Sequence, residues 1–527
     1  MQRALASSRG MVTAPHHLAA QAGIAVLRDG GNAVEAMVAA AATIAVVYPH
    51  MNSIGGDGFW LISQPGKDPI AIDACGRAAG LATIDWYRGQ GVLAIPARGP
   101  LAANTVAGAV SGWKAALDVT AAKLPLARLL QDALGYARDG VPVTRSQVDY
   151  TGRFLGELAP QPGFASTFLR EGAPPPAGSL QRFPALASTF EQLARNGLDD
   201  FYRGELAQSL AAELRRLGSP LRAGDLASHH ASIVAPLAVE LSVGTAYNLP
   251  PPTQGLASLM ILAIFDRIRA DAAAESFAHV HGIVEATKQA FLVRNRHVGD
   301  PQHMRVAAAD FLRDDAIARC ASAIDAHRAR PWPEPAVKGD TVWMGAADSN
   351  GCMVSYIQSV YWEFGSGVVL DGTGVTWQNR GASFSLDQAS HVALAPGRKP
   401  FHTLNPAFAR LGDGREIVYG NMGGDGQPQS QAAVFSRHVM YGQDLQQAVN
   451  APRWLLGRTW GNMSVSLKLE RRFDPSLVDA LRRAGHEVEL VDEYSDLVGH
   501  AGALVRNPQG VIIGATDPRS DGAVAGW

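Results

Sequence analysis

Residues 339–352 read Gly-Asp-Thr-Val-Trp-Met-Gly-Ala-Ala-Asp-Ser-Asn-Gly-Cys and divide the chain into two parts of different character. Before them, residues 328–340 contain three prolines in thirteen positions, which indicates an extended linker. After the linker, residues 341–347 and 352–359 are two strand-like runs, and the Asp-Ser-Asn-Gly between them is typical of a turn. The sequence therefore predicts a hairpin whose first strand begins at Thr341.

Hairpins are also predicted near both ends of the chain. The strand-like runs 59–63 and 70–74 flank a Pro-Gly-Lys-Asp turn, and the runs 501–505 and 511–515 flank Asn-Pro-Gln-Gly. Between these parts, residues 101–325 have a mainly helical pattern. Hairpins at the ends and after the linker, with helices between them, indicate an α+β architecture with paired sheets rather than a doubly wound βαβ array.

Two helices are predicted near the N-terminus. Residues 12–28 have a helical pattern that ends at Asp29-Gly30-Gly31. A second helix begins at Asn32, and Glu35 three residues later completes a capping-box signature. This second helix is rich in alanine and ends at Tyr48-Pro49. Its small side chains suit burial against a sheet.

The composition is that of a compact globular protein. Of 527 residues, 47% are hydrophobic and 18% are charged, which argues against disorder. The 46 basic and 48 acidic residues give a net charge of −2, so neither a nucleic-acid partner nor a polybasic membrane contact is predicted. The longest apolar stretch, residues 36–47, is too short to span a bilayer. Residues 1–10 contain no secretory h-region, so we expect a cytoplasmic protein.

The sequence also argues against metal and cofactor chemistry. Cys75, Cys320 and Cys352 lie far apart and form neither a disulfide framework nor a metal-ligand spacing. The histidines in residues 229–230 and 279–281 have no matching cluster elsewhere in the sequence, and we interpret them as solvated or core histidines. Serine-elbow, phosphate-loop and dinucleotide motifs do not occur. We therefore predict no cofactor and no metal.

A series of short blocks follows Thr341. Each block alone is a weak motif, but the ordered set is specific. The blocks are Phe364-Gly365-Ser366-Gly367, Gln378-Asn379-Arg380-Gly381, residues 398–406 (Arg-Lys-Pro-Phe-His-Thr-Leu-Asn-Pro), residues 420–429 (Gly-Asn-Met-Gly-Gly-Asp-Gly-Gln-Pro-Gln) and Asp517-Pro518-Arg519. In this order they resemble the γ-glutamyltransferase-like family of N-terminal-nucleophile hydrolases. The resemblance covers nearly the whole chain, beginning at residues 28–34 (Arg-Asp-Gly-Gly-Asn-Ala-Val).

The resemblance implies a four-layer αββα sandwich and a chain that cuts itself before Thr341. The large fragment, residues 1–340, and the small fragment, residues 341–527, are then expected to form one intertwined domain, and two such pairs can associate as a dimer of heterodimers. A threonine hydroxyl is a weak nucleophile that needs a base. A cut between Asp340 and Thr341 frees the α-amino group of Thr341, which is uncharged often enough near neutral pH to accept the hydroxyl proton.

The resemblance also assigns the catalytic residues. Thr341 is the expected nucleophile, and Ser359 falls where the family keeps a hydroxyl that hydrogen-bonds the nucleophile. Gly423 and Gly424 match the glycine pair whose backbone N–H groups form the oxyanion hole. Glycine suits this role because the absence of a Cβ lets the backbone come close to the substrate.

The substrate-binding positions depart from those of the γ-glutamyl enzymes. The segment that would hold a substrate α-amino group, residues 379–384, reads Asn-Arg-Gly-Ala-Ser-Phe and contains no carboxylate. A buried ammonium group needs an anionic or strongly accepting partner, and this site offers arginine instead. Tyr361 and Trp362 also narrow the predicted cavity. We therefore expect a small anionic amide without an ammonium group near the scissile bond. The residues predicted to contact it are Arg77, Tyr361, Asn379, Arg380, His402 and Thr403.

Within the family, the oxamate amidohydrolase branch fits these features best, and it converts oxamate to oxalate and ammonia late in purine breakdown. Arg77 is the first choice for binding the substrate carboxylate, and Arg380 is the second. Two other substrate classes remain open: a γ-glutamyl compound such as glutathione, in hydrolysis or transfer, and a glutaryl-cephalosporin. A further alternative is an unprocessed relative that acts as a binding protein, against which the intact catalytic set argues.

Overall fold

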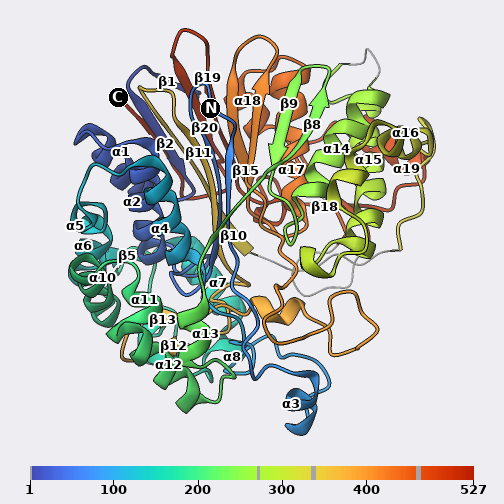
Figure 1. Cartoon of the computed structure of the whole chain (residues 1–527). Helices are drawn as coiled ribbons and strands as arrows, with labels where there is room; N and C mark the ends of the chain where they lie inside the picture. Colours follow the sequence, from blue (N-terminus) through green and yellow to red (C-terminus); the bar gives the residue numbers. More distant parts are fainter. Residues whose placement is uncertain (1–2, 270–272, 334–339, 458–464) are drawn as a thin grey trace.

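The computed structural model of the chain describes residues 3–269, 273–333, 340–457 and 465–527. Its elements form four layers, with two β-sheets stacked in the middle and helices on both outer sides (Figure 1). This arrangement is the predicted αββα sandwich.

The strand that contains Thr341 lies in the middle of a seven-stranded antiparallel sheet. In spatial order the strands are β21 (Ala523–Gly526), β2 (Gly10–Ala14), β10 (Asp340–Asp348), β11 (Met353–Tyr361), β3 (Asp57–Ser63), β4 (Ile70–Ala74) and β7 (Ser232–Val234). The predicted hairpins β3–β4 and β10–β11 are confirmed. Strands β10 and β11, which come late in the chain, lie between β2 and β3, which come early. The parts of the chain before and after residue 340 are therefore interleaved in one sheet.

A second antiparallel sheet of seven strands stacks on the first, and it contains the predicted C-terminal hairpin β19–β20. Its strands are, in spatial order, β1 (Leu5–Ser7), β20 (Ile512–Thr516), β19 (Ala501–Arg506), β15 (Glu416–Asn421), β14 (Ala407–Leu411), β9 (Gly244–Asn248) and β8 (Leu237–Leu241). Smaller sheets join β5 (Val141–Pro142) to β6 (Leu180–Gln181), β12 (Val369–Leu370) to β13 (Val375–Thr376), and β16 (Trp454–Leu456), β17 (Leu467–Glu470) and β18 (Val488–Val491) to one another.

Helices form the two outer layers. The layer on the first sheet, at the left of Figure 1, contains α1 (His17–Arg28), α2 (Ala33–Val47) and α4 (Ala109–Thr120), with α5 (Leu126–Leu129), α6 (Gln131–Asp139) and α10 (Pro184–Asn196) outside them. The layer on the second sheet contains α14 (Gly255–Ile268), α15 (Phe277–His297), α16 (Asp314–Ser322), α17 (Gly426–Phe435), α18 (Leu445–Asn450) and α19 (Pro475–Arg483). The remaining helices are α3 (Ile84–Gly89), α7 (Arg145–Arg153), α8 (Leu155–Leu158), α9 (Phe164–Phe168), α11 (Asp200–Arg203), α12 (Glu205–Leu217) and α13 (Ala223–Ser228). No helix in the described ranges has the length and apolar character needed to cross a membrane.

The N-terminal helices differ from the prediction at one end. The capping box of α2 forms as expected, because Asn32 N donates to Glu35 Oε2 at 2.8 Å and Glu35 N donates to Asn32 Oδ1 at 3.0 Å. All of α2 is buried, which explains its alanine content. The prediction that the first helix spans residues 12–28 is wrong at its start, since α1 begins at His17. Residues 10–14 form β2 instead, because they pair with β10 and β21, which are distant in sequence.

Both sheets are buried on both faces, and the apolar side chains of β3 show why. Phe59 and Leu61 point into the core between the two sheets, whereas Trp60 and Ile62 point into the core between the first sheet and its helices. Successive side chains of a strand alternate between its faces, so a strand in an inner layer needs apolar residues at every position. A third core joins the second sheet to α14, α15 and α17.

Trp343, two residues after Thr341, lies between the sheets in a slot lined by glycines. A Cβ added to Gly420 of β15 would lie 2.1 Å from its Cδ1, and one added to Gly502 of β19 would lie 2.6 Å from its Cζ3. The indole Nε1 donates to Ser355 Oγ at 2.9 Å. The indole thus fixes the position of β10, and of Thr341 with it, against the second sheet.

We expect Gly420→Ala to lower the free energy of unfolding by about 1–3 kcal/mol, because the new methyl group overlaps the Trp343 ring in a packed core. Urea denaturation measures this change. Adding Trp343→Leu should restore part of the loss. Gly135→Ala in α6 is the control, since a Cβ there meets no atom within 4 Å. A Gly420→Ala variant as stable as the wild type would contradict the close packing of the Trp343 ring against Gly420.

Candidate active site

Thr341 lies at an irregularity near the start of β10 and is 1% exposed. Asp340 pairs with Tyr361 of β11, but the next pair is Val342 with Gln358, so a β-bulge separates them. The bulge places Thr341 opposite residues 359–360 and outside the regular ladder. Bulges re-aim side chains and are frequent beside active sites. The predicted cleavage bond, Asp340–Thr341, therefore lies where the backbone is released from regular strand pairing.

Ser359, the predicted hydroxyl partner of Thr341, belongs to this bulge. It is buried, and its Oγ accepts a hydrogen bond from Tyr361 N at 2.8 Å. Tyr361 has a φ of +84°, a left-handed conformation that is rare for a residue with a side chain. Such strain persists only where neighbouring groups impose it, and here the Ser359 hydroxyl is one of those groups.

Gly423 and Gly424 form the turn between β15 and α17, with φ values of +119° and +52°. Neither glycine N–H has a hydrogen-bond acceptor within the described ranges. The carbonyl oxygen of Gly424 accepts from Gln254 Nε2 at 2.8 Å, which fixes the orientation of this turn. Free N–H groups just before a helix N-terminus are suited to bind developing negative charge, as the predicted oxyanion hole requires.

A chain of buried amide side chains joins Thr341 to the predicted substrate residues. Gln427 Nε2 donates to Thr341 Oγ1 at 3.4 Å, and Asn405 Nδ2 donates to Gln427 Oε1 at 3.1 Å. Asn405 Nδ2 and Gln254 Nε2 also donate to the carbonyl oxygen of Thr403, at 2.9 and 2.7 Å. Thr341 and Thr403, 62 positions apart in sequence, therefore belong to one hydrogen-bonded unit.

Sequence reasoning did not single out these amides. Gln427 and Asn405 stand inside the blocks 420–429 and 398–406, so their place in the blocks was the available signal. Arg294 of α15 was missed as well. Its guanidinium donates to Gln254 Oε1 at 2.8 Å and makes a bidentate ion pair with Asp425 at 2.8 and 3.1 Å.

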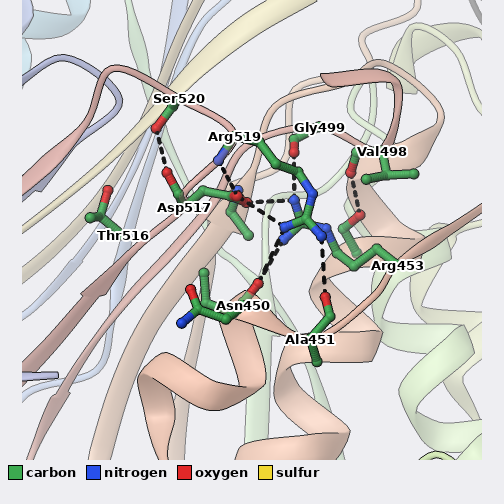
Figure 2. A network of polar contacts seen from close by, with 12 residues as sticks. Asn450, Ala451, Arg453, Val498, Gly499, Thr516, Asp517, Arg519 and Ser520 are labelled. Carbon is green, nitrogen blue, oxygen red and sulfur yellow. Dashed lines mark hydrogen bonds and ion pairs between the residues drawn. The ribbon is translucent and has the colours of Figure 1, made fainter. Parts of the chain in front are cut away.

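The Asp517-Pro518-Arg519 block takes part in a buried polar network with Arg453 and Gly499 (Figure 2). Buried Asp517 pairs with Arg453 and with Arg519, and Arg453 Nη2 also donates to the Gly499 carbonyl oxygen. Although burial alone raises it, the two arginines lower the pKa of Asp517 to about 2. A Cβ added to Gly423 would lie 3.3 Å from Gly499 Cα, so the network holds the segment before β19, against which the glycine turn packs.

We expect Gly424→Val to slow both self-cleavage and turnover by about 10²–10³-fold, because a side chain at this left-handed position displaces the N–H donor. Gel electrophoresis and ammonia release measure the two rates. Gly412→Ala, in a turn with free space around it, is the matched control. Near-normal rates in Gly424→Val would place the oxyanion hole elsewhere.

Arg380 is completely buried beside the hydrogen-bonded unit that contains Thr341 and Thr403. Its guanidinium carbon lies 3.9 Å from the centroid of the Tyr361 ring, and Nη1 is 3.5 Å from Thr403 Oγ1. Burial lowers the pKa of Arg380 to about 10, so the group stays charged at neutral pH. Its Nε and Nη2 have no hydrogen-bond partner among the described residues. A buried cation with free donors is suited to bind a carboxylate.

His402 and Asp57 form a buried pair close to Arg380. His402 Nε2 and Asp57 Oδ2 are 2.9 Å apart, and both side chains are fully buried. Asp57 Oδ1 accepts from Gly76 N, Gly108 N and Gln378 Nε2 at 2.9, 3.0 and 3.2 Å. Burial raises the pKa of Asp57 to about 7 despite these donors and the nearby Arg380. Burial and Arg380 hold the pKa of His402 well below its usual range, so its ring is neutral.

The two other predicted substrate residues contact backbone instead. Arg77 is partly exposed, and its Nη1 donates to the Gly397 carbonyl oxygen at 2.9 Å. The Asn379 amide accepts from Trp362 N at 3.2 Å and donates to the Ala97 carbonyl oxygen at 2.8 Å. The structure therefore brings Tyr361, Arg380, His402 and Thr403 together, while Arg77 and Asn379 hold loops in place. A substrate contact by either of these two stays a prediction.

The fold assembles two groups of potential metal ligands that the sequence did not indicate. One is Asp57, Cys75 and His402, and the other is His281, Glu285 and His486. His281, interpreted from the sequence as a solvated or core histidine, is buried, and the fold brings it beside Glu285 of the same helix and His486, which follows α19. A cation already lies at the second group, since Lys288 Nζ is 2.7 Å from Glu285 Oε1. Arg380 lies beside the first group, and its positive charge disfavours the binding of a metal cation there.

The chain matches the family model of gamma-glutamyltranspeptidase over residues 19–527. It belongs to this family. Two curated relatives in the family match along their full length. The oxamate amidohydrolase proenzyme of Klebsiella pneumoniae is 57% identical and covers 99% of both chains. The glutathione hydrolase-like proenzyme YwrD of Bacillus subtilis is 38% identical and covers 100% of both.

Solved structures of the gamma-glutamyltranspeptidase family agree with the fold. The crystal structure of cephalosporin acylase from Bacillus halodurans has a TM-score of 0.92 and 34% identity, and it covers 100% of this chain and 97% of its own. Relatives named as hydrolases or acylases thus share the whole architecture. The chain is accordingly assigned to a family of amide-bond hydrolases, and the resemblance to the oxamate amidohydrolase branch is confirmed.

Proposed function

We propose that the chain is a proenzyme that cuts itself between Asp340 and Thr341 and then hydrolyses oxamate to oxalate and ammonia. The relative named oxamate amidohydrolase proenzyme, 57% identical over nearly the full length, supports both parts. Fragments 1–340 and 341–527 then remain associated as a heterodimer, since strands from both share each sheet. The resemblance implies a role late in purine breakdown, and we propose that the enzyme acts in the cytoplasm.

The observation that carries the choice of substrate is the buried guanidinium of Arg380. Its free Nε and Nη2 can hold the oxamate carboxylate through two parallel hydrogen bonds. Oxamate has its carboxylate on the carbon next to the amide carbonyl, so the anchor must lie close to the nucleophile. Arg380 supports this placement, because its guanidinium stacks on the ring of Tyr361. Tyr361 in turn pairs with Asp340, the neighbour of Thr341 in the sequence.

The chemistry then follows from the described groups. The Thr341 α-amino group accepts the hydroxyl proton while Oγ1 attacks the amide carbon, and Gln427 keeps Oγ1 oriented. The N–H groups of Gly423 and Gly424 stabilise the negative charge on the carbonyl oxygen. The tetrahedral intermediate expels ammonia, which takes the proton back from the α-amino group. Water then attacks the oxalyl ester of Thr341 and releases oxalate.

A cephalosporin acylase activity is the second candidate, and it is supported by the 34% identical acylase structure. A glutaryl side chain also presents a carboxylate without an ammonium group. Its carboxylate lies several bonds from the scissile amide, however, which fits less well an anchor that stacks on Tyr361, opposite the start of the Thr341 strand. A γ-glutamyl substrate adds an ammonium group, which would meet the charged guanidinium of Arg380.

The test is ammonia release from oxamate by the purified two-fragment protein, compared with cleavage of glutathione and of a glutaryl amide. We expect turnover of oxamate only. Rapid cleavage of glutathione without oxamate turnover would establish the γ-glutamyl alternative, and cleavage of the glutaryl amide alone would establish the acylase. A protein that stays uncut and inactive on all three would be a binding relative.

A further inference from the structure

Asp57 lies between the strand that contains Ser359 and the buried Arg380 group, although no role follows for it from the reaction itself. It begins β3, and it pairs in register with Ser359 of β11. Its carboxylate contacts His402 and lies near Arg380. The residue is completely buried. Burying a carboxylate costs free energy, so the presence of Asp57 at this position needs an explanation beyond packing.

The two carboxylate oxygens of Asp57 make different hydrogen bonds. Oδ1 accepts three hydrogen bonds, from Gly76 N, Gly108 N and Gln378 Nε2, and these hold the side chain in one orientation. Oδ2 contacts only His402 Nε2 among the described residues. A proton on Oδ2 can therefore be added or removed without disturbing the Oδ1 contacts, because either Oδ2 or the neutral imidazole can donate across that contact.

The other ionisable groups around Asp57 keep one charge state near neutral pH. Burial raises the pKa of the Cys75 thiol and of the Tyr202 and Tyr356 hydroxyls, so these groups are neutral. Lys399 is charged and paired with Asp73 at 2.5 Å. Arg380 is charged, and its guanidinium stacks on the ring of Tyr361. Asp57 is the group in this described cluster whose pKa lies near 7.

We propose that Asp57 is a proton-linked positioning residue, whose carboxylate takes up a proton when a substrate carboxylate binds to Arg380. This inference rests on the proposed function, because it requires the Arg380 pocket to be the anion site. With Asp57 ionised, the charges of Arg380 and Asp57 cancel, and a bound carboxylate would add an uncompensated buried anion. Protonation of Asp57 restores the balance and leaves the full charge of Arg380 to the substrate.

The sign of the pH dependence follows. In the empty site the pKa of Asp57 is about 7, and a bound anion raises it further, because a second negative charge disfavours the ionised form. Anion affinity is therefore constant below about pH 6, where Asp57 is already protonated. Above pH 7 it falls by up to about tenfold per pH unit until the higher pKa of the occupied site is reached.

Asp57→Asn separates this role from a purely structural one. Asparagine keeps an acceptor for the three Oδ1 donors and can donate to His402, but it carries no charge in either state. We expect the variant to bind oxalate as tightly as the wild type at pH 6. At pH 8.5 it should bind up to about 30-fold more tightly than the wild type, since the wild type alone must take up a proton. Structural damage would weaken binding at both pH values.

The experiment is calorimetric titration of the processed protein with oxalate at pH 6 and 8.5, in two buffers that differ in ionisation enthalpy. The proton uptake at pH 8.5 should be larger in the wild type than in Asp57→Asn by up to one proton. The Thr341 α-amino group titrates in both proteins, so the difference isolates Asp57. Asp118→Asn, a change at an exposed carboxylate on α4, is the control and should behave as the wild type.

Each outcome decides one question. If oxalate does not bind to the wild type at either pH, the Arg380 anion site and the proposed function both fail. If oxalate binds but proton uptake and affinity are the same in both proteins, the role of Asp57 fails and the proposed function stands. If Asp57→Asn does not fold, the wild type still tests the inference, because the uptake of less than half a proton at pH 8.5 overturns it.

Discussion

Replacing Thr341 with alanine should leave a single uncut chain without amidase activity. The variant has neither the hydroxyl that attacks nor, without the cut, the free α-amino group that accepts its proton. Loss of a nucleophile costs on the order of 10⁴–10⁶ in turnover. Denaturing gel electrophoresis and ammonia release measure the two effects, and the wild type should show two fragments, residues 1–340 and 341–527.

Two controls make the Thr341→Ala result specific. Thr341→Ser keeps a hydroxyl and should still cut itself, more slowly. Thr13→Ala removes another buried threonine of the same sheet, on β2, and should be processed normally. N-terminal sequencing of the small fragment must begin Thr341-Val342-Trp343. A different N-terminus, or normal processing of Thr341→Ala, would remove Thr341 from the nucleophile position.

Arg380→Lys should still cut itself but lose most of its turnover of oxamate. Lysine keeps the charge but cannot supply two parallel donors from a plane stacked on Tyr361. Losing such a charge-assisted contact costs about 2–4 kcal/mol, or roughly 30- to 1,000-fold in kcat/KM. The measurement is the dependence of ammonia release on oxamate concentration, together with the fraction of cut chain, which should match that of the wild type.

Arg77→Lys is the matched variant, because Arg77 was the first choice from sequence. In the structure its guanidinium is partly exposed and donates to a backbone carbonyl, so we expect a loss of less than about threefold. If Arg77→Lys loses oxamate turnover and Arg380→Lys does not, the sequence-based order was right. Full activity in both variants would refute an arginine anchor for the carboxylate.

Local signals explain which elements the sequence predicted well. The hairpins around β3–β4, β10–β11 and β19–β20 all have turn residues between strand-like runs, and all three are confirmed. The capping box of Asn32 and Glu35 likewise marks the true start of α2. The sequence pattern places residues 12–14 in a helix instead of β2, because the pairing partners of β2, β10 and β21, lie more than 300 positions away. No local sequence pattern indicates that β2 pairs with strands so far away in the chain.

The candidate site shows the same division. Its residue types were available from the ordered blocks, so Thr341, Ser359, Gly423, Gly424 and Arg380 could be proposed from the resemblance alone. The choice between Arg77 and Arg380 as the carboxylate anchor could not be predicted from the sequence, because it depends on how deeply each side chain is buried. Both candidates are arginines, so the residue type does not distinguish them. Arg380 is fully buried and has donors without a partner among the described residues, whereas Arg77 is partly exposed and donates to a backbone carbonyl oxygen. Asp57 was visible only as part of a glycine-rich strand entry.

The sequence by itself thus determined the family, the layered α+β fold and the position of the expected cut, because these depend on turn chemistry, alternation and ordered short motifs. Only the tertiary structure decided the bulge at Thr341, the amide chain through Gln427 and Asn405, and the pairing of Asp57 with His402. These features join segments that are remote in sequence. Their energies arise from burial and from direct contact between side chains, and neither exists until the two sheets have packed.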